Sequence, residues 1–272
     1  CSDGNGLVYV GSKLGSSNSQ LWYIAYPEGT VRSITNDLSD YDHTSLGITS
    51  DMSTIVATHQ ELRSNIWVLT KNTSSGEPWN AGNAIQITSG SATWDGFGGI
   101  DWTPDNKIVY ASRSGKNNGL WIMNDDGSNG RQLTIGDHTE YSPCVSPDGR
   151  FIAYTSRKDT TPHIWRMDID GSNSVKLSFA EDHSPSMSPD GAFVFYSGWA
   201  TGVTLLYKVP VTGGDSVRIS SNPASNPEVS PDGKYIVCRY YNEGKRKWEG
   251  AILNLNDASL RRVFDFPNSF LY

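Results

Sequence analysis

The 272-residue sequence predicts an all-β fold in which a four-stranded antiparallel unit is repeated six times around a closed ring. Three observations lead to this prediction. A Ser-Pro-Asp-Gly turn recurs between apolar segments, the residues around it align along the chain, and the C-terminal residues match the strand that the first unit lacks. A unit of this kind has two apolar faces, and it can bury them only against further copies of itself.

The clearest unit spans residues 141–178. Its turn, Ser146-Pro147-Asp148-Gly149, combines a proline that sets φ, an aspartate that can bond the backbone two residues on, and a glycine that accepts positive φ. An Asp-Gly pair at residues 170–171 marks the hairpin before the last strand. The expected strands are 142–146, 151–156, 163–168 and 175–178.

The copies follow one another at 1–35, 44–88, 98–134, 141–178, 184–220 and 226–264. The copy at 44–88 is the most divergent, because residues 49–52 replace the turn and residues 71–83 lengthen a hairpin. The first copy lacks its innermost strand. Residues 269–272 align with the strand that precedes the turn in the other copies, so we expect the two chain ends to pair in one sheet and to close a single domain.

The repeat consists of Ser-Pro-Asp-Gly, an apolar strand ending in Tyr-x-Ser, then Leu/Ile-Trp-x-Met-Asp, Asp-Gly and Leu-Thr. It resembles the TolB-like six-bladed β-propellers, whose repeats are called PD40 or WD40-like. The resemblance covers essentially the whole chain and implies a monomeric six-bladed β-propeller with four antiparallel strands per blade, located in the periplasm or secreted. The chain also resembles the extracytoplasmic sensor propellers of some bacterial Ser/Thr kinases, although it contains no kinase motif.

Composition excludes several classes of partner. The net charge of −7 argues against nucleic acid or an anionic membrane surface. No apolar run approaches the roughly 18 residues of a membrane span. Three cysteines do not make a disulfide framework, and we expect Cys144 and Cys238 to be small buried hydrophobic residues.

The tryptophans fall into two groups in this repeat. Those at one position of the third strand are expected in the core: Trp22, Trp67, Trp121 and Trp165. Trp102, on an innermost strand, is expected there too. Those expected in loops, where a large exposed ring needs a reason, are Trp94, Trp199 and Trp248.

Strand order predicts which loops share an end of the blades. The Ser-Pro-Asp-Gly turns and Asp-Gly hairpins lie at one end, here called the turn end. The hairpins between second and third strands and the connections between blades lie at the other, the connection end. Asp-His-Thr/Ser recurs in three of these connections, at residues 42–44, 137–139 and 182–184. We expect them to form a negative channel mouth, although an aspartate there can instead bond loop backbone.

The candidate ligand-binding residues at this mouth are Asp42, His43, Trp94, Asp95, His138, Glu140, Tyr141, Asp182, His183 and Trp199. The aromatic rings would form walls for a polar or cationic ligand tip. Histidines that titrate near their ordinary pKa of about 6.5 would make binding pH-dependent between about pH 5.5 and 7.5.

The sequence contains no Gly-x-Ser-x-Gly elbow, no His-Glu-x-x-His, no phosphate-binding glycine loop and no Cys-x-x-Cys, so no catalytic residue is assigned. The prediction is a non-enzymatic binding or sensor module without a cofactor, which recognises a protein, peptide or glycan at the channel mouth. One alternative is a metal-assisted enzyme similar to oligogalacturonide lyases, with a divalent metal on His43, His138 and His183. Another is the propeller of a prolyl-oligopeptidase-type peptidase without its hydrolase domain.

Overall fold

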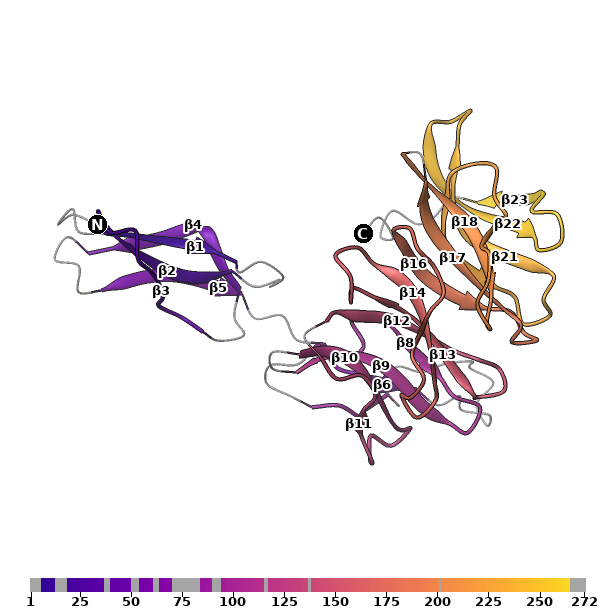
Figure 1. Cartoon of the computed structure of the whole chain (residues 1–272), viewed down its shortest axis with the longest axis horizontal. Coiled ribbons are helices and arrows are strands. Elements are labelled where there is room, and N and C mark those ends of the chain that lie inside the picture. The colour runs from indigo at the N-terminus through magenta and orange to yellow at the C-terminus, as the bar shows by residue number, and fades with distance from the viewer. Residues whose placement is uncertain are drawn as a thin grey trace. The chain divides into compact units, whose positions relative to one another are not determined.

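The computed structural model describes residues 6–12, 19–36, 40–49, 54–60, 64–69, 84–89, 94–114, 117–136, 138–200 and 202–264. Every regular element in these ranges is a β-strand (Figure 1). In this part of the chain there is accordingly no helix long and apolar enough to cross a membrane. The chain divides into two compact units, Cys1–Arg63 and Ser64–Tyr272.

The first unit contains a three-stranded and a two-stranded antiparallel sheet. The first sheet consists of β1 (Gly6–Gly11), β2 (Gln20–Ala25) and β3 (Val31–Ser33), and the second of β4 (Asp40–Ile48) and β5 (Ile55–Gln60). Tyr9 lies opposite Trp22, whose indole nitrogen donates a hydrogen bond to the carbonyl of Gly11 at 2.7 Å. The aromatic residues of these two strands therefore tie the sheet together.

The second unit contains four antiparallel sheets of four strands each, and one two-stranded ladder. The ladder is β6 (Trp67–Val68) with β7 (Ile85–Gln86). The first two large sheets are β8 (Ile100–Trp102), β9 (Lys107–Ser114), β10 (Asn117–Asn124) and β11 (Arg131–Gln132), then β12 (Glu140–Val145), β13 (Phe151–Ser156), β14 (His163–Asp168) and β15 (Val175–Lys176). The others are β16 (Asp182–Met187), β17 (Phe193–Ala200), β18 (Val203–Pro210) and β19 (Val217–Arg218), then β20 (Ala224–Val229), β21 (Tyr235–Asn242), β22 (Lys247–Asn254) and β23 (Leu260–Phe264).

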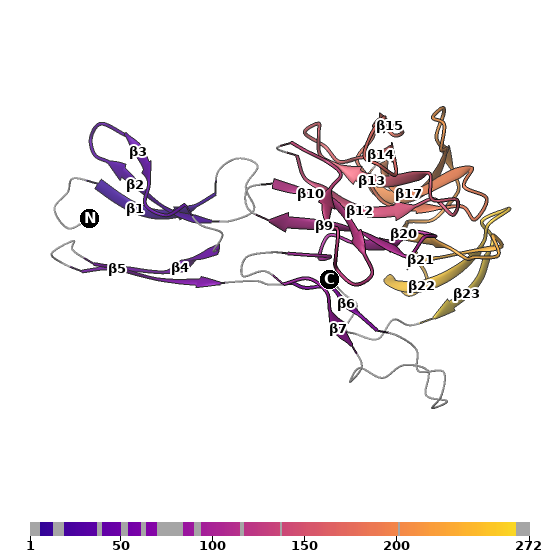
Figure 2. The ribbon, with the colours of Figure 1, turned by 90° about the horizontal axis from the view of Figure 1, so that it is seen from below.

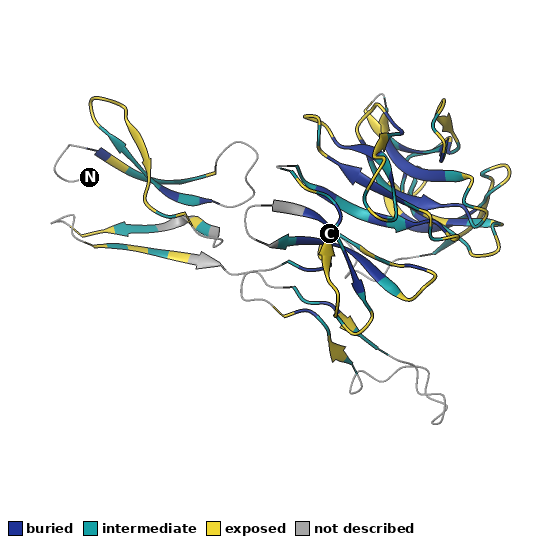
Figure 3. Cartoon of the chain, turned by 60° about the horizontal axis from the view of Figure 1, so that its bottom comes forward, coloured by how far each residue is buried: buried dark blue, intermediate teal, exposed yellow. Residues whose placement is uncertain are grey.

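Within each large sheet the strands are hydrogen-bonded in chain order. The first strands β8, β12, β16 and β20 contact one another in succession, so each sheet lies against the next (Figure 2). Three hydrophobic clusters fill the spaces between consecutive sheets. Buried residues are accordingly concentrated in these sheets (Figure 3).

The Ser-Pro-Asp-Gly turn is held by its own side chains. The hydroxyl of Ser146 accepts the N–H of Phe151 at 2.9 Å and donates to Asp148 at 2.7 Å. Hydrogen bonds from Ser146 and Arg150 lower the pKa of Asp148 to about 2, and Gly149 has a φ of 70°. The corresponding bonds recur around Ser188 and Ser230, so the repeated residues are structural.

The second and third strands meet through a pair of large residues. Tyr110 lies opposite Trp121, Tyr154 opposite Trp165, and Tyr196 opposite Tyr207. Tyr154 is fully buried, and its hydroxyl is hydrogen-bonded to that of Ser174 at 2.7 Å. Cys238 is buried in the core, as expected, whereas Cys144 is half-buried. Burial raises the pKa of both thiols to about 12.

Two tryptophan predictions are wrong. Trp67 is 57% exposed and Trp102 is 49% exposed, so neither ring belongs to the core. Trp102 occupies the position of Val145 on an innermost strand, but its side chain is exposed at the surface of this part of the structure. The β6–β7 ladder that carries Trp67 has only two residues per strand, too little to cover a ring.

The all-β class and the four-stranded antiparallel unit are confirmed, with sheets at the positions of the last four predicted copies. The divergent copy at 44–88 differs, because β4 and β5 belong to the first unit while β6 and β7 belong to the second. Ring closure through residues 269–272 and a single propeller remain predictions, since residues 1–5 and 265–272 lie outside the described part.

Candidate functional site

The candidate site lies at the connection end of the second unit, where each sheet leads into the first strand of the next. The first strands of three sheets share a bulge near this end, with Ser142, Ser184 and Asn226 at φ of 51°, 54° and 54°. The register matches Tyr141 with His183, and Glu140 with Asp182, across two successive sheets. These bulges turn the side chains just before them toward the neighbouring sheet.

Three of the predicted carboxylates are buried, and two of them accept hydrogen bonds from nearby residues. Asp95 accepts the hydroxyl of Ser112 at 2.5 Å, and Asp182 accepts the backbone N–H of Ala180 at 3.1 Å. Glu140 lies opposite Ser156. All three are buried, and desolvation raises the pKa of both Glu140 and Asp182. The expectation that these charges line an open mouth is therefore not met, and backbone and hydroxyl bonding explains them instead.

A second group of side chains joins two sheets at the surface. The Tyr141 hydroxyl is hydrogen-bonded to Nδ1 of His183 at 2.9 Å, and their rings lie 6.2 Å apart. Nε2 of His183 lies 3.7 Å from Oε1 of Glu181, and Arg157 acts to lower the pKa of Tyr141. Burial raises the pKa of Tyr141 and, outweighing Glu181, lowers that of His183. The imidazole is thus neutral at pH 7 and is held by its neighbours.

Aromatic rings flank this group on both sides. Trp94 packs edge-on against Phe97 with ring centroids 5.2 Å apart, and the guanidinium of Arg113 lies 5.1 Å from the centroid of Trp94. Phe97 is 73% exposed and Trp199 is 51% exposed. Rings of this size at the surface are typical of recognition sites.

Backbone bonds connect the flanking rings to the central pair. Ser142 donates to the carbonyl of Gly98, next to Phe97, at 2.5 Å, and Trp199 donates to the carbonyl of Glu181 at 2.8 Å. Trp94, Phe97, Tyr141, His183 and Trp199 therefore follow one another over three sheets, and we call these five residues the aromatic ridge.

The three Asp-His pairs do not occupy equivalent positions. His183 lies inside β16, whereas His138 precedes β12 by two residues, so their side chains start from different levels of the sheet. His138 is half-buried beside Gly136, and its charge is a minor cause that lowers the pKa of Glu140. Asp42 is exposed in the first unit, and the His43 side chain and Asp137 lie outside the described residues. Spacing along the sequence was a poor guide here, because the bulged strands set the register.

The described residues contain no group of three or more His, Cys, Asp or Glu side chains arranged to hold a metal. Phe97 was missed by the sequence analysis. The signal was available, since a phenylalanine within the Gly-Phe-Gly-Gly segment 96–99 has no place in the repeat.

Together these features define an all-β protein with consecutive four-stranded sheets and a row of aromatic side chains at their connection end. The family model described as "TolB beta propeller domain" matches residues 86–197. Residues 86–197 carry the TolB-type β-propeller repeat, and the fold of the chain is of the TolB-like propeller class.

Solved structures agree with this fold at low identity. The putative TolB from Agrobacterium tumefaciens is 17% identical, with 85% of this chain and 83% of that chain covered and a TM-score of 0.57. An oligogalacturonate lyase from Vibrio parahaemolyticus is 15% identical, with 97% and 75% covered and a TM-score of 0.55.

A puromycin-hydrolyzing peptidase from Mycobacterium tuberculosis is 12% identical, with a TM-score of 0.58. The match covers 97% of this chain but 45% of the peptidase. No curated protein matches the chain. Similarity at these identities concerns the fold and does not choose among binding proteins, lyases and peptidases.

Proposed function

We propose that this protein is a non-enzymatic binding module that recognises a protein or peptide segment on the aromatic ridge. The observation that carries the proposal is the run of exposed and half-buried rings over three sheets, tied by the Tyr141–His183 hydrogen bond at 2.9 Å. Large rings anchor protein segments with little loss of conformational entropy, since each has only two side-chain torsions. The buried carboxylates Asp95, Glu140 and Asp182 support the loops beneath.

The charges along the ridge indicate what the segment contains. The guanidinium of Arg113 lies over the ring of Trp94, and the charge of Arg157 acts to lower the pKa of Tyr141, so two cationic groups accompany the rings. Glu181 adds one carboxylate beside His183. A segment with an apolar or aromatic anchor flanked by acidic groups would complement this surface, and a cationic segment would meet mostly like charge.

The lowered pKa of His183 changes the expected pH dependence. Because burial favours the neutral imidazole, protonation begins only below its ordinary pKa of about 6.5. Binding that uses neutral His183 should be constant from about pH 7 upward and should weaken only on acidification past that value. The sequence had suggested a change between about pH 5.5 and 7.5, around the ordinary histidine pKa of about 6.5.

A phage-displayed peptide library panned on the purified chain tests this proposal. We expect selected peptides to lose affinity by about tenfold or more for Trp199→Ala and His183→Ala, while Arg150→Ala at the turn end leaves binding unchanged. Circular dichroism of each variant checks the fold. Peptides that bind all variants equally, or turnover of polygalacturonate or peptide substrates by the purified chain, would overturn the proposal.

Location and wider architecture belong to the proposal as well. A TolB-like repeat supports an extracytoplasmic binding domain acting alone or as a sensor, as the resemblance implied. Fractionation of the producing cells with an epitope-tagged copy tests the location, and recovery with cytoplasmic markers would contradict it.

A further inference from the structure

The turn end of the second unit differs between two successive sheet interfaces. We call the interface of the β12–β15 sheet with the β16–β19 sheet the filled interface, and that of the β8–β11 sheet with the β12–β15 sheet the cavity interface. At the filled interface β13 begins with Phe151, which packs against the same cluster as Val211. Phe193 and Leu255 share a cluster in the same way one sheet further on.

At the cavity interface, Lys107 takes the position that Phe151 has at the filled interface. Lys107 lies opposite Asn124, just as Phe151 lies opposite Asp168. The preceding turn is one residue shorter, because Thr103 bonds the carbonyl of Lys107 whereas Ser146 bonds that of Phe151. The Lys107 ammonium turns away to Asp105 at 2.6 Å. No ring therefore occupies this position at the turn end of the interface, although the cluster that contains Tyr154 fills the space deeper between the two sheets.

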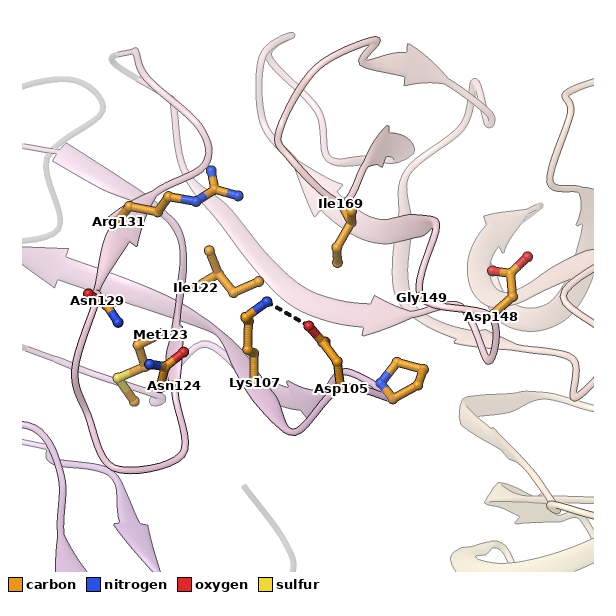
Figure 4. Close-up of a pocket in the computed structure, with 11 residues that line it drawn as sticks. Asp105, Lys107, Ile122, Met123, Asn124, Asn129, Arg131, Asp148, Gly149 and Ile169 are labelled. Atoms are coloured by element: carbon orange, nitrogen blue, oxygen red, sulfur yellow. Dashed lines mark hydrogen bonds and ion pairs between the residues drawn. The ribbon is translucent and has the colours of Figure 1, made fainter.

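A cavity of about 450 Å³ opens at this place. It lies between the β8–β9 turn, the β10–β11 hairpin and the β12–β13 turn, and Ile122, Met123 and Ile169 form its apolar wall (Figure 4). Ile169 follows β14 as Val211 follows β18, so it is the residue that an aromatic ring of the preceding sheet would contact. The volume suits a ligand with a single ring.

The arginine that lies over Phe151 at the filled interface is replaced at the cavity interface as well. At the filled interface the guanidinium of Arg166 lies 4.5 Å from the centroid of Phe151, whereas the equivalent position at the cavity interface is Ile122. Positive charge comes instead from Lys107 and from Arg131, whose guanidinium extends along the rim (Figure 4). The cavity thus combines an aliphatic wall with two cationic groups.

These cations are available to an anion. Arg131 donates to the backbone carbonyl of Asp170 at 3.1 Å and forms no ion pair with any residue that the structure describes. Lys107 is paired only with Asp105 at the surface, and such pairs contribute little. Asp105 and Asp148 are each bonded by the serine or threonine of their own turn, so both carboxylates keep partners when Lys107 moves.

We propose that this cavity binds a small aromatic carboxylate. The ring takes the place that Phe151 takes at the filled interface, against Ile122 and Ile169, and the carboxylate accepts hydrogen bonds from Arg131 and Lys107. A planar monoanion fits the guanidinium fork, while a more highly charged group would be repelled by the two turn aspartates. This site lies at the turn end and is independent of the aromatic ridge.

Methyl NMR of the whole chain tests the proposal with 3-phenylpropionate as the probe. The Ile122 and Ile169 methyl signals should shift saturably, because an aromatic ring lies against them. Two related compounds separate the contribution of the ring from that of the carboxylate. 3-Phenylpropan-1-ol keeps the ring without the charge, and propionate keeps the charge without the ring. Both should bind at least about tenfold more weakly, the effect of losing one charge-assisted contact or the ring.

Substitutions of Lys107 and Arg131 test whether these two cations bind the carboxylate, independently of any effect on the fold. Lys107→Met and Arg131→Gln should each weaken 3-phenylpropionate by about tenfold without changing the spectrum elsewhere. Lys234→Met removes a turn lysine that is paired with Asp232 away from the cavity, and it should leave the affinity unchanged. Lys107→Phe should fill the space and abolish the methyl shifts.

Peptides ending in phenylalanine distinguish a free acid from a chain terminus as the source of this chemistry. Equal shifts with acetyl-Gly-Gly-Phe would place a peptide end in the cavity, whereas its failure beside tight 3-phenylpropionate binding would assign a small molecule. If neither 3-phenylpropionate nor acetyl-Gly-Gly-Phe produces saturable shifts at concentrations up to about 10 mM, a range that would reveal even weak specific binding, the proposal is overturned. Equal binding of propionate, or unchanged binding to Lys107→Phe, would overturn it too.

Discussion

The cavity interface and the filled interface are made from the same repeat, yet they close in different ways. Both keep the hydrogen-bonded turn, the antiparallel register and the contact between first strands. They differ in the turn by one residue and in several side chains, of which the most consequential are Lys107 in place of Phe151 and Ile122 in place of Arg166. The repeat therefore fixes the backbone and the core of each interface, while a few side chains at the turn end decide whether that end is filled or open.

The largest difference between the interfaces should appear on truncation of these side chains. Phe151→Ala removes a half-buried ring from the filled interface and should lower the free energy of unfolding by about 2–3 kcal/mol, below the ~3–5 kcal/mol of a fully buried ring. Lys107→Ala removes a side chain with no ring contact and should cost less than about 0.5 kcal/mol. Urea denaturation measures both values, and equal losses would show that the interfaces do not differ as described.

The turn glycines provide a second contrast. Gly149 has a φ of 70°, and an added methyl would lie 3.2 Å from Pro104 at the cavity interface. Gly191 has a φ of 68°, but its methyl would lie 3.8 Å from Pro147 at the filled interface. Both substitutions to alanine should cost about 1–2 kcal/mol from the left-handed backbone, and Gly149→Ala should cost more because Pro104 must shift.

The same urea midpoints decide this second contrast. A smaller loss for Gly149→Ala than for Gly191→Ala would mean that the first interface is looser at its turns as well as at Lys107. Thermal melts of both variants give an independent ranking, with the unmodified chain as the reference.

Filling the cavity should stabilise the protein. Lys107→Phe gives up a surface ion pair with Asp105, worth about 0–1 kcal/mol, and covers Ile122 and Ile169 with a ring. A net gain of about 1 kcal/mol is typical for cavity filling. The reciprocal change, Phe151→Lys, should destabilise the filled interface. A loss of stability in Lys107→Phe would mean that the shorter turn cannot direct a ring into the space.

The sequence predicted the fold well because its strongest signals are local. The serine, aspartate and glycine of each turn bond one another within a few residues, as Ser146 and Asp148 do, and these bonds do not depend on the rest of the chain. The sheets of the last four copies follow from them. The copy at 44–88 lacks such a turn, and there the structure departs from the predicted unit.

The candidate site was less predictable, because it depends on register and burial. The sequence placed Tyr141, His183 and Trp199 at the connection end, where the structure has them, but it treated Asp182, which is buried, as a ligand-facing charge. A bulge between His183 and Ser186 sets which side chain faces the neighbouring sheet, and no residue pattern marks that bulge. The cavity at Lys107 was missed for a related reason, since it appears only when two sheets are compared position by position.

The smallest expected effect concerns Asp101, which links β8 to β12 across the cavity interface. Its Oδ2 accepts the backbone N–H of Val145 at 2.6 Å, and Cys144 stands in the same position at the filled interface. Burial raises the pKa of Asp101, against the opposing effect of the N–H groups of Val145 and Trp102, and Asp101 in turn adds to the raised pKa of Glu228.

A raised pKa in the folded state means that the ionised form is penalised. The contribution of Asp101 to the free energy of unfolding is therefore greatest below the ordinary pKa of aspartate, about 3.9, and falls as pH rises from there through the folded-state pKa. Asp101→Asn keeps an acceptor for Val145 but cannot ionise. We expect it to be more stable than the unmodified chain at pH 7, by less than about 1 kcal/mol, with the difference vanishing near pH 3. Cys144→Ser is the matched control and should show no such pH dependence, because a thiol with a pKa of about 12 does not titrate in this range. A difference between Asp101→Asn and the unmodified chain that stays constant from pH 3 to pH 7 would mean that hydrogen bonding, and not the buried charge, distinguishes the cavity interface at this position.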